Sequence, residues 1–390
     1  MAKISRKIYL DYAATTPVDP RVVKAMLPYF SEKFGNTMSL HAFGQEAKGI
    51  LEESREKVAD LMGAKPSEIF FTGSATESNN LALKGISEAN KKKGRHIIIS
   101  VIEHPCVKES AKWLESQGFE ITRIKVDKYG LVNIRDVEKA IRKDTILVSV
   151  IHASNEIGTI EPIGEIGKIC REKGVYFHTD AAQSFGKIPI DVNKMNIDLL
   201  TASSQKMYGP KGAGCLFVRE GVKISPILHG GGHESGLRSS TVNIPAIVGF
   251  SEAVKICKKV MKAEGQRITK LRNKLIKGAL SKIPYSYLNG HPTKRLPNNA
   301  NFWFEGVEGE SIVIQLDLLG VAASTGSACS SAKLEPSDVL LAIGLRPQEA
   351  HGSLRLSLGR WTTEKEINYI LKVLPKIIKK LRKMSPFKIN

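Results

Sequence analysis

The sequence predicts an α/β protein in which a large domain, built on a mainly parallel β-sheet flanked by helices, is joined to a smaller α+β domain. Three observations support this prediction. Short apolar runs alternate with helix-length segments between residues 67 and about 220, as in chains that fold into parallel sheets with helices on both faces. The apolar spacing then becomes helical, and 390 residues with 42% hydrophobic composition suffice for one full core and a smaller second core.

The strands of the large sheet are expected at seven apolar runs. These runs cover residues 68–71, 96–101, 119–126, 145–151, 175–180, 198–203 and 214–218. Open parallel sheets bind their ligands beyond the carboxyl ends of the strands. The polar residues directly after each run are therefore the first candidates for a functional site.

Helices are expected on both sides of this region. Asp19 followed by Pro20 combines a helix cap with a proline at the first helical position, and residues 42–62 are amphipathic up to a stop at Gly63. Residues 243–282 have helical periodicity and no strand signals.

The last part of the chain, residues 299–390, mixes short strands with helices. We expect the two domains to divide near residue 260, with the N-terminal segment folding back onto the smaller domain. Residues 16–260 would then form the large domain, and residues 1–15 together with 261–390 would form the small domain.

Composition narrows the functional classes. The net charge of +19 could indicate an anionic partner such as RNA, but the basic residues are spread along many helices, which favours a solvated surface and no direct nucleic-acid binding. No apolar run approaches the roughly 20 residues of a membrane helix, and the first ten residues lack a secretory signal. The five scattered cysteines predict reduced thiols rather than a disulfide framework. We expect a cytoplasmic protein that does not associate with membranes.

Lys206 lies just beyond the apolar run of residues 198–203, ahead of a turn that contains Pro210 and several glycines. A rigid loop would direct this lysine into the crevice at the strand ends, where a partly desolvated amine is suited to Schiff-base chemistry. A surface lysine is the alternative interpretation.

Two further strand ends carry polar groups. Residues 72–80, with the sequence TGSATESNN, follow the first strand and open a helix, so their N–H groups and hydroxyls can surround an anion. Asp180 follows another strand, where a carboxylate can keep a pyridine nitrogen protonated. A helix cap would explain either feature alone. Together with Lys206 they fit one cofactor, with its phosphate at residues 74–77, its pyridinium at Asp180 and its aldehyde on Lys206.

The chain resembles a known family at this point. The segments YLDYAATTP, SATESNN, EHP, NEIGT, HTDAAQ, KMYGPKG, GGGHE, STGSAC and SLRLSLGR occur in the order and approximate spacing of cysteine desulfurases of the NifS/IscS type. The resemblance spans nearly the whole chain. It implies the aspartate-aminotransferase type of fold, pyridoxal 5′-phosphate as cofactor, and a homodimer with active sites at the subunit interface.

The resemblance also implies roles for matching residues. Lys206 would form the Schiff base with pyridoxal phosphate, and Asp180 would pair with the pyridinium nitrogen. His104 would stack on the ring and move protons, and Gln183 would reach the phenolic oxygen. Without the resemblance, a packed histidine would be the preferred interpretation of His104.

A further set of residues would hold the phosphate and the substrate. Phosphate contacts are implied for Ala75, Thr76, Ser203, Gln205 and, from the neighbouring subunit, Thr241. Asn155 would contact the cofactor and, with Arg355, the carboxylate of L-cysteine, for which a planar guanidinium is suited. Taken alone, Arg355 would be interpreted as part of a surface ion pair. No resident metal is expected.

Cys329 lies in AASTGSACSSAKLEPS, a stretch rich in Ser, Gly and Ala that is too polar for a core. An exposed thiol on a mobile loop is what a sulfur carrier needs, because it must visit the substrate and then an acceptor. The resemblance implies that Cys329 takes the sulfur as a persulfide, leaves alanine, and passes the sulfur to an iron–sulfur scaffold or another acceptor such as a tRNA-thiolation enzyme. It could also ligate a transferred iron–sulfur cluster. Burial is preferred for Cys170, Cys215 and Cys257, and also for Cys106 despite its nearness to His104.

Two positions depart from the family pattern. Gln205 stands where the family usually has histidine, and it can donate a hydrogen bond to phosphate but carries no positive charge. Ser240 stands where a glycine is common. The alternatives to a cysteine desulfurase are a selenocysteine lyase or another pyridoxal-phosphate enzyme of the same fold, and, less favoured, an RNA-associated protein with a vestigial site.

Overall fold

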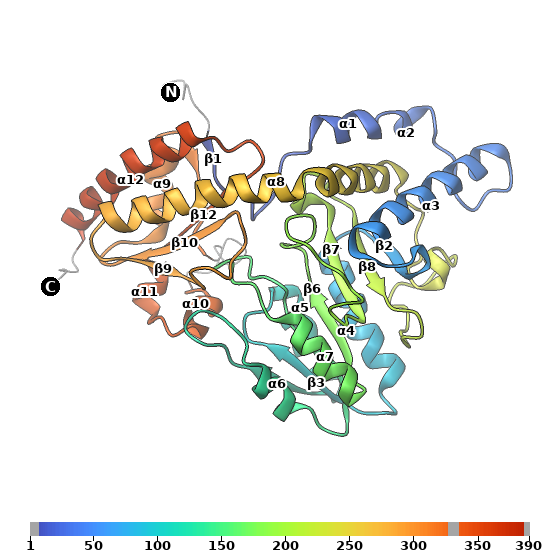
Figure 1. The fold of residues 1–390 in the computed structure, drawn as a ribbon. Helices are drawn as coiled ribbons and strands as arrows, with labels where there is room; N and C mark the ends of the chain where they lie inside the picture. Colours follow the sequence, from blue (N-terminus) through green and yellow to red (C-terminus); the bar gives the residue numbers. More distant parts are fainter. Residues whose placement is uncertain (1–7, 327–334, 386–390) are drawn as a thin grey trace.

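The computed structural model describes residues 8–326 and 335–385. Its centre is a seven-stranded sheet with the strand order β2-β8-β7-β6-β5-β3-β4 (Figure 1). The bounds are β2 Ile69–Thr72, β3 His96–Ser100, β4 Glu120–Ile124, β5 Thr145–Ser149, β6 Tyr176–Asp180, β7 Leu199–Ser203 and β8 Gly214–Val218. Each strand lies within one residue of a predicted apolar run, so the α/β fold class is confirmed.

The sheet is parallel except at β8. This strand runs antiparallel to both of its neighbours, β2 and β7, whereas the other adjacent pairs are parallel. A turn of ten residues joins β7 to β8, which is long enough for an antiparallel return but too short for a parallel crossover helix. That turn contains the segment around Lys206.

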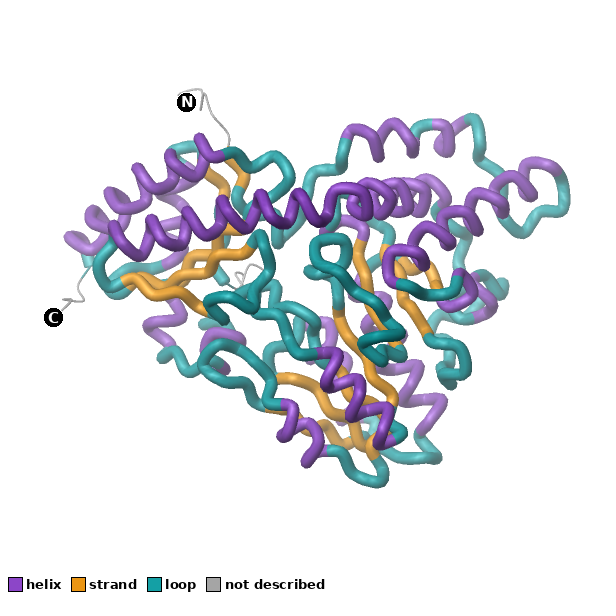
Figure 2. The backbone as a smooth tube through the Cα atoms, in the orientation of Figure 1, coloured by secondary structure: helices purple, strands orange, loops and turns teal. Residues whose placement is uncertain are grey.

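Helices cover both faces of the large sheet (Figure 2). The helices α4 Ala75–Asn90 and α5 Pro105–Ser116 share one apolar core with the sheet. The helices α3 Ala42–Met62, α6 Ile134–Ala140, α7 Ile163–Lys173 and the first half of α8 Ile244–Lys282 share another. The sheet is thereby buried on both faces, in agreement with its nearly continuous apolar strands.

The helix boundaries follow local signals in the sequence. Asp19 caps α1 Pro20–Met26 by accepting from the Arg21 N–H, and Pro20 occupies the first helical position as predicted. The helix α2, Pro28–Ser31, follows directly. Gly63 ends α3 with a φ of 71°, a left-handed conformation that glycine adopts without a Cβ penalty.

A second core belongs to the C-terminal part of the chain. Its three-stranded sheet has the order β12-β10-β9, with β9 Ser286–Asn289, β10 Asn299–Phe304 and β12 Ser353–Ser357. The helices α9 Gly309–Asp317 and α12 Glu364–Met384 pack into this core, whereas α10 Asp338–Ala342 and α11 Pro347–His351 pack in a smaller cluster with Ile102, Ile151 and Ile157. The second half of α8 packs into this core, so one continuous helix spans both cores (Figure 1).

The N-terminal segment crosses to the second core. The strand β1, Ile8–Tyr9, pairs in parallel with β11, Val321–Ala322. The predicted domain boundary near residue 260 falls within α8, and the division of the chain into domains stays a prediction.

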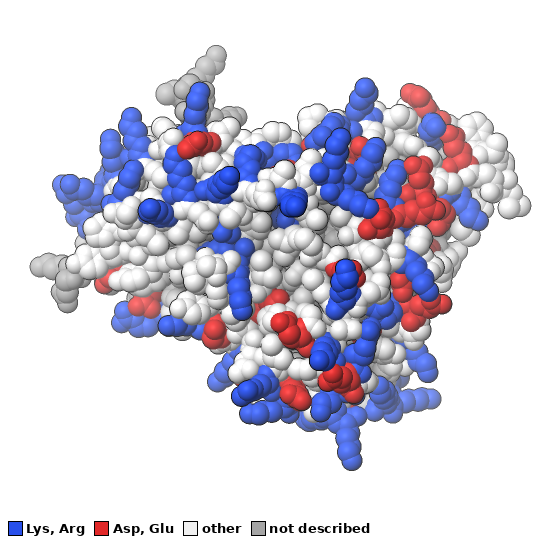
Figure 3. Space-filling model, viewed as in Figure 1, with Lys and Arg blue, Asp and Glu red and all other residues white. Residues whose placement is uncertain are grey.

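Charge is distributed widely over the molecule. Lys and Arg side chains are scattered over the visible face and are interrupted by acidic residues (Figure 3). In the described part of the chain, no helix is long and apolar enough to cross a membrane.

Candidate functional site

Lys206 ends a short 3-10 turn that follows β7. Its Nζ donates a hydrogen bond of 2.9 Å to the carbonyl oxygen of Ala13 and a second bond to the carbonyl of Ala14. The Thr16 hydroxyl fixes this N-terminal segment by donating to the Gln205 carbonyl at 2.9 Å. The lysine amine is thus held beyond the carboxyl end of β7, where the sequence predicted it.

Gln183 meets the same N-terminal segment. It lies three residues beyond β6, and its Nε2 donates to the Ala13 carbonyl oxygen at 2.9 Å. Because Lys206 donates to this oxygen too, one acceptor brings the two side chains together.

Asp180 is buried at the carboxyl end of β6. Its Oδ1 accepts from the Ala182 N–H at 2.8 Å, and its Oδ2 accepts from Asn79 Nδ2 at 2.7 Å. Asn79 lies in the second turn of α4 and is fully buried. The carboxylate is therefore fixed from two sides, by the backbone after its own strand and by a helix that packs on the sheet.

His104 is the N-cap of α5, and its Nδ1 accepts from the Cys106 N–H at 3.3 Å. Burial lowers the pKa of His104, while the charge of Asp180 raises it and that of Lys206 lowers it. The charges of Asp180 and Lys206, the two groups that the sequence assigned to the cofactor, therefore both act on the imidazole.

The N-terminus of α4 offers the predicted anion site. Ser74 caps this helix by accepting from the Glu77 N–H, and Ala75 and Thr76 are its first two residues, whose N–H groups have no carbonyl partner within the helix. Ser203 lies buried at the end of β7. A Cβ on Gly214 would come within 2.8 Å of the Ser74 carbonyl carbon, so a glycine is needed for β8 to pass this close.

Gln205 and Thr241 are the remaining phosphate candidates. The Gln205 Oε1 accepts from the Thr15 hydroxyl at 3.1 Å, so its amide oxygen faces the N-terminal segment. Thr241 is exposed, and Ser240 before it lines a small cavity with Gly73 of the same chain. The role of the neighbouring subunit's Thr241 stays a prediction.

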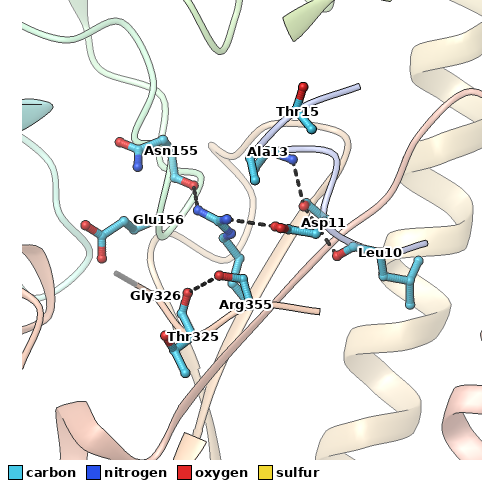
Figure 4. Close-up of polar contacts among 12 residues, drawn as sticks. Leu10, Asp11, Ala13, Thr15, Asn155, Glu156, Thr325, Gly326 and Arg355 are labelled. Atoms are coloured by element: carbon cyan, nitrogen blue, oxygen red, sulfur yellow. Dashed lines mark hydrogen bonds and ion pairs between the residues drawn. The ribbon is translucent and has the colours of Figure 1, made fainter. Parts of the chain in front are cut away.

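Arg355 occupies the middle of β12 and is almost completely buried. Its guanidinium lies between two partners (Figure 4): Nη2 pairs with Asp11 Oδ1 at 2.9 Å, and Nη1 donates to the Asn155 carbonyl oxygen at 3.1 Å. Its Nε is buried and has no hydrogen-bond partner among the described residues. The structure therefore places Arg355 beside the backbone of Asn155 and adds Asp11, while the joint role of Arg355 and Asn155 in substrate binding stays a prediction.

Of the four cysteines that the structure describes, three are buried as predicted and one is not. Cys170, Cys215 and Cys257 are buried. Cys329 lies outside the described residues. Cys106 is only partly buried, and its Sγ lies 3.0 Å from His104 Nδ1.

Sequence reasoning missed three contributors to this site, namely Asn79, Cys106 and Asp11. The segments SATESNN and YLDYAATTP contain Asn79 and Asp11, so the resemblance pointed to their neighbourhood without giving them a role. Their positions depend on contacts across more than 100 residues, from Asn79 to Asp180 and from Asp11 to Arg355, which no local pattern reveals.

Comparisons with known proteins identify the family. The family model for aminotransferase class-V matches residues 8–370. This chain belongs to that family. It is 51% identical over 385 residues to the protein named cysteine desulfurase IscS of Clostridium botulinum, covering 98% of this chain and 97% of the relative. It is 53% identical over 378 residues to cysteine desulfurase IscS 1 of Archaeoglobus fulgidus, covering 97% and 98%. Within aminotransferase class-V, the chain is therefore a member of the NifS/IscS-type cysteine desulfurases.

Solved structures of this family agree with the fold. A NifS-like protein matches with a TM-score of 0.91 and 38% identity, over 96% of this chain and 100% of that one. A NifS-like protein from Rickettsia africae matches with a TM-score of 0.87 and 31% identity, over 96% and 100%.

Proposed function

We propose that this protein is a pyridoxal-phosphate-dependent cysteine desulfurase, which converts L-cysteine to L-alanine and carries the released sulfur as a persulfide on Cys329. The observation that carries the proposal is the convergence of Lys206, Gln183 and Asp180, beyond the carboxyl ends of β6 and β7, with His104, beyond the end of β3, in a chain about half identical to proteins named cysteine desulfurase.

The described residues fit the cofactor. Asp180 offers a buried carboxylate for the ring nitrogen, and the first turn of α4 offers N–H groups for the phosphate, joined by Ser203, Gln205 and, in our proposal, the neighbouring subunit's Thr241. When bound, pyridoxal 5′-phosphate supplies an electron sink for bond breaking at the α-carbon of an amino acid.

The substrate would be bound at Arg355. Its buried Nε lacks a partner among the described residues, and such an atom is costly unless a ligand or water satisfies it. A substrate carboxylate would meet that N–H, with Asn155 alongside. The Lys206 amine would then remove the α-proton, and His104 would help return a proton to the product.

The sulfur would leave as follows. The Cys329 thiolate attacks the sulfur of the bound cysteine, the carbon–sulfur bond breaks, and a sulfur–sulfur bond forms on Cys329. The carbon gains the proton that balances the reaction, and alanine departs. We further propose that the sulfur passes to an iron–sulfur scaffold or another acceptor such as a tRNA-thiolation enzyme, and that the protein acts in the cytoplasm as a homodimer.

The decisive experiment concerns Cys329. The Cys329→Ser variant should bind cofactor and cysteine yet release almost no alanine, because a hydroxyl is essentially unionised at neutral pH. Wild-type protein given cysteine without reductant should gain the mass of one sulfur atom on the peptide that contains Cys329. The variants Cys170→Ala and Cys215→Ala, which change buried thiols, serve as controls and should keep both results.

Three results would count against the proposal. Cys329→Ser could desulfurate cysteine at the wild-type rate, the added sulfur could map to another cysteine, or the protein could act on selenocysteine and leave cysteine unchanged. If the purified protein lacked a yellow absorbance band even after incubation with pyridoxal phosphate, the proposal that pyridoxal phosphate is its cofactor would be refuted. Lys206→Ala should lose that band.

A further inference from the structure

Cys106 lies within the proposed site, but the proposed chemistry gives it no part. Its Sγ is 3.0 Å from His104 Nδ1 and 3.0 Å from Asn79 Nδ2. Asn79 Nδ2 is also 2.7 Å from Asp180 Oδ2. These contacts form a continuous chain of four side chains, from Asp180 through Asn79 and Cys106 to His104, that links the residue expected at the ring nitrogen to the residue expected to stack on the ring.

The direction of each hydrogen bond follows from its donors and acceptors. The Asn79 amide nitrogen has two hydrogens, of which one points to the Asp180 carboxylate and the other to the Cys106 sulfur. The Thr76 hydroxyl also lowers the pKa of the thiol through a hydrogen bond, so it too donates to the sulfur. Since the sulfur accepts from Asn79 and Thr76, its own hydrogen remains for His104 Nδ1. The Cys106 backbone N–H also donates to this nitrogen, at 3.3 Å, so Nδ1 acts as an acceptor for two donors of one residue.

The protonation states of both residues agree with this direction. Burial raises the pKa of the Cys106 thiol to about 12, so the thiol keeps its hydrogen at neutral pH. Burial also lowers the pKa of His104, which favours a neutral ring with a lone pair on one nitrogen. The other charged groups that act on this pair are Asp180, Glu103, Lys206 and Lys108.

We propose that Cys106 is a positioning residue whose thiol donates to Nδ1 of His104 and so holds the imidazole in the tautomer with its hydrogen on Nε2. This inference rests on the proposed function, which gives His104 its part in proton movement. It adds that Nε2 is the nitrogen that presents a hydrogen to the reacting groups, and that Cys106 acts through His104 and carries no sulfur.

The test uses nitrogen-15 spectra of the full-length protein as purified, labelled in its nine histidines and without substrate. The His104 signals are assigned by their loss in His104→Gln. In wild type we expect the Nε2–H tautomer. Cys106→Ala removes one donor to Nδ1, so the neutral ring loses stabilisation and His104 should titrate at a higher pH than in wild type. Cys106→Ser keeps a donor and should restore the wild-type titration.

The variants separate positioning from packing. If Cys106→Ala and Cys106→Ser shift the titration equally, the sulfur acts through its volume alone and the inference is wrong. A hydrogen on Nδ1 in wild type, or a titration unchanged in Cys106→Ala, would also overturn it. Thermal midpoints of both variants are measured alongside, since a loss of folding would appear there. The spectra require no turnover, so a failure of the desulfurase proposal would appear separately, as wild-type protein that forms no alanine.

Discussion

The buried carboxylate side chains of this protein differ in how many hydrogen bonds they accept. Asp180 accepts from a backbone N–H and from Asn79, which satisfies both of its oxygens. Glu103 and Glu161 each leave one oxygen without a partner among the described residues. Burial raises the pKa of both glutamates to about 8. The buried carboxylate that we assign to the cofactor is thus held on both oxygens, whereas burial disfavours the ionisation of these two glutamates.

Replacement of Asp180 tests the cofactor assignment. We expect Asp180→Ala, at saturating pyridoxal phosphate, to form alanine more slowly by on the order of 100-fold or more, because the charge that stabilises the reacting ring is lost. Asp198→Ala is a matched control, because Asp198 directly precedes β7 and so lies at the amino end of that strand, opposite to the end at which the site lies. Its carboxylate accepts from the Phe177 N–H at 2.9 Å. Near-normal alanine formation by Asp180→Ala would refute the assignment.

Glu161 should make stability depend on pH. Its pKa is about 8 in the folded protein against 4.5 for the free side chain, so between these values the folded state binds more protons and stability falls as pH rises. Glu161→Gln stays neutral and keeps an oxygen for the Val132 N–H. We expect the variant to match wild type near pH 4.5 and to exceed its unfolding free energy by roughly 1 to 3 kcal/mol at pH 8.5.

Urea unfolding at the two pH values measures this difference. The exposed Glu56, changed to Gln, provides the control and should follow wild type at both. Equal stability of Glu161→Gln and wild type at pH 8.5 would show that Glu161 ionises without penalty in the folded state.

At the scale of helices and strands, the sequence predicted most of what the structure contains. The apolar runs located all seven strands of the large sheet, because strands buried on both faces need continuous apolar residues. It did not predict that β8 runs antiparallel, since direction depends on the short turn and not on the strand residues. The residues of the candidate site were likewise predicted only in part. The strand-end rule located Lys206 and Asp180, whereas Asn79 and Asp11 reach the site through long-range contacts.

The end of α3 offers a direct test of a backbone requirement. Gly63 has a φ of 71°, and a Cβ there would meet nothing closer than 3.5 Å. Conformation rather than space should therefore decide the outcome, and Gly63→Ala is expected to lower the unfolding free energy by about 1 kcal/mol. Gly49 lies on the exposed side of the same helix, and a Cβ added to it would have no other atom within 4 Å, so Gly49→Ala should instead raise stability by roughly 0.5 to 1 kcal/mol. Thermal or urea unfolding that showed the same sign for both changes would contradict this account.

At the scale of the whole molecule, one end carries an unusual group of exposed apolar side chains. They lie around α2 and the loop before α3, at the end of the molecule farthest from the second core (Figure 1). The group consists of Leu27, Phe30, Phe34, Met38, Leu40 and Phe43. Phe34 and Phe43 stack on each other, and a group of exposed apolar side chains of this size is typical of a protein interface. It supports the proposed homodimer.

Leu40 is 92% exposed, so its replacement removes almost no contact within the chain. We expect Leu40→Asp to raise the dimer dissociation constant about tenfold or more, because the dimer would bury an unpaired charge. Light scattering after gel filtration should give twice the 42.8 kDa chain mass for wild type. Leu318→Asp, at an exposed leucine next to α9, is the control and should leave the dimer intact. If the wild-type protein were monomeric at micromolar concentration, the proposal of a homodimer would be refuted.

The pairing of β1 with β11 also affects how the chain folds during synthesis. Ribosomes add about 5 to 20 residues per second, so β1 emerges on the order of 20 to 60 s before the strand that it pairs with. The carbonyls of Ala13 and Ala14, which hold the Lys206 amine, follow β1 closely in the chain. The large sheet, Lys206 and these carbonyls, which the bond from Thr16 to Gln205 holds in place, can therefore all assemble on the ribosome before β11 is made. A nascent chain stalled before residue 321 would still lack Cys329 and Arg355, so the enzyme would become competent to take sulfur from cysteine only as its translation ends.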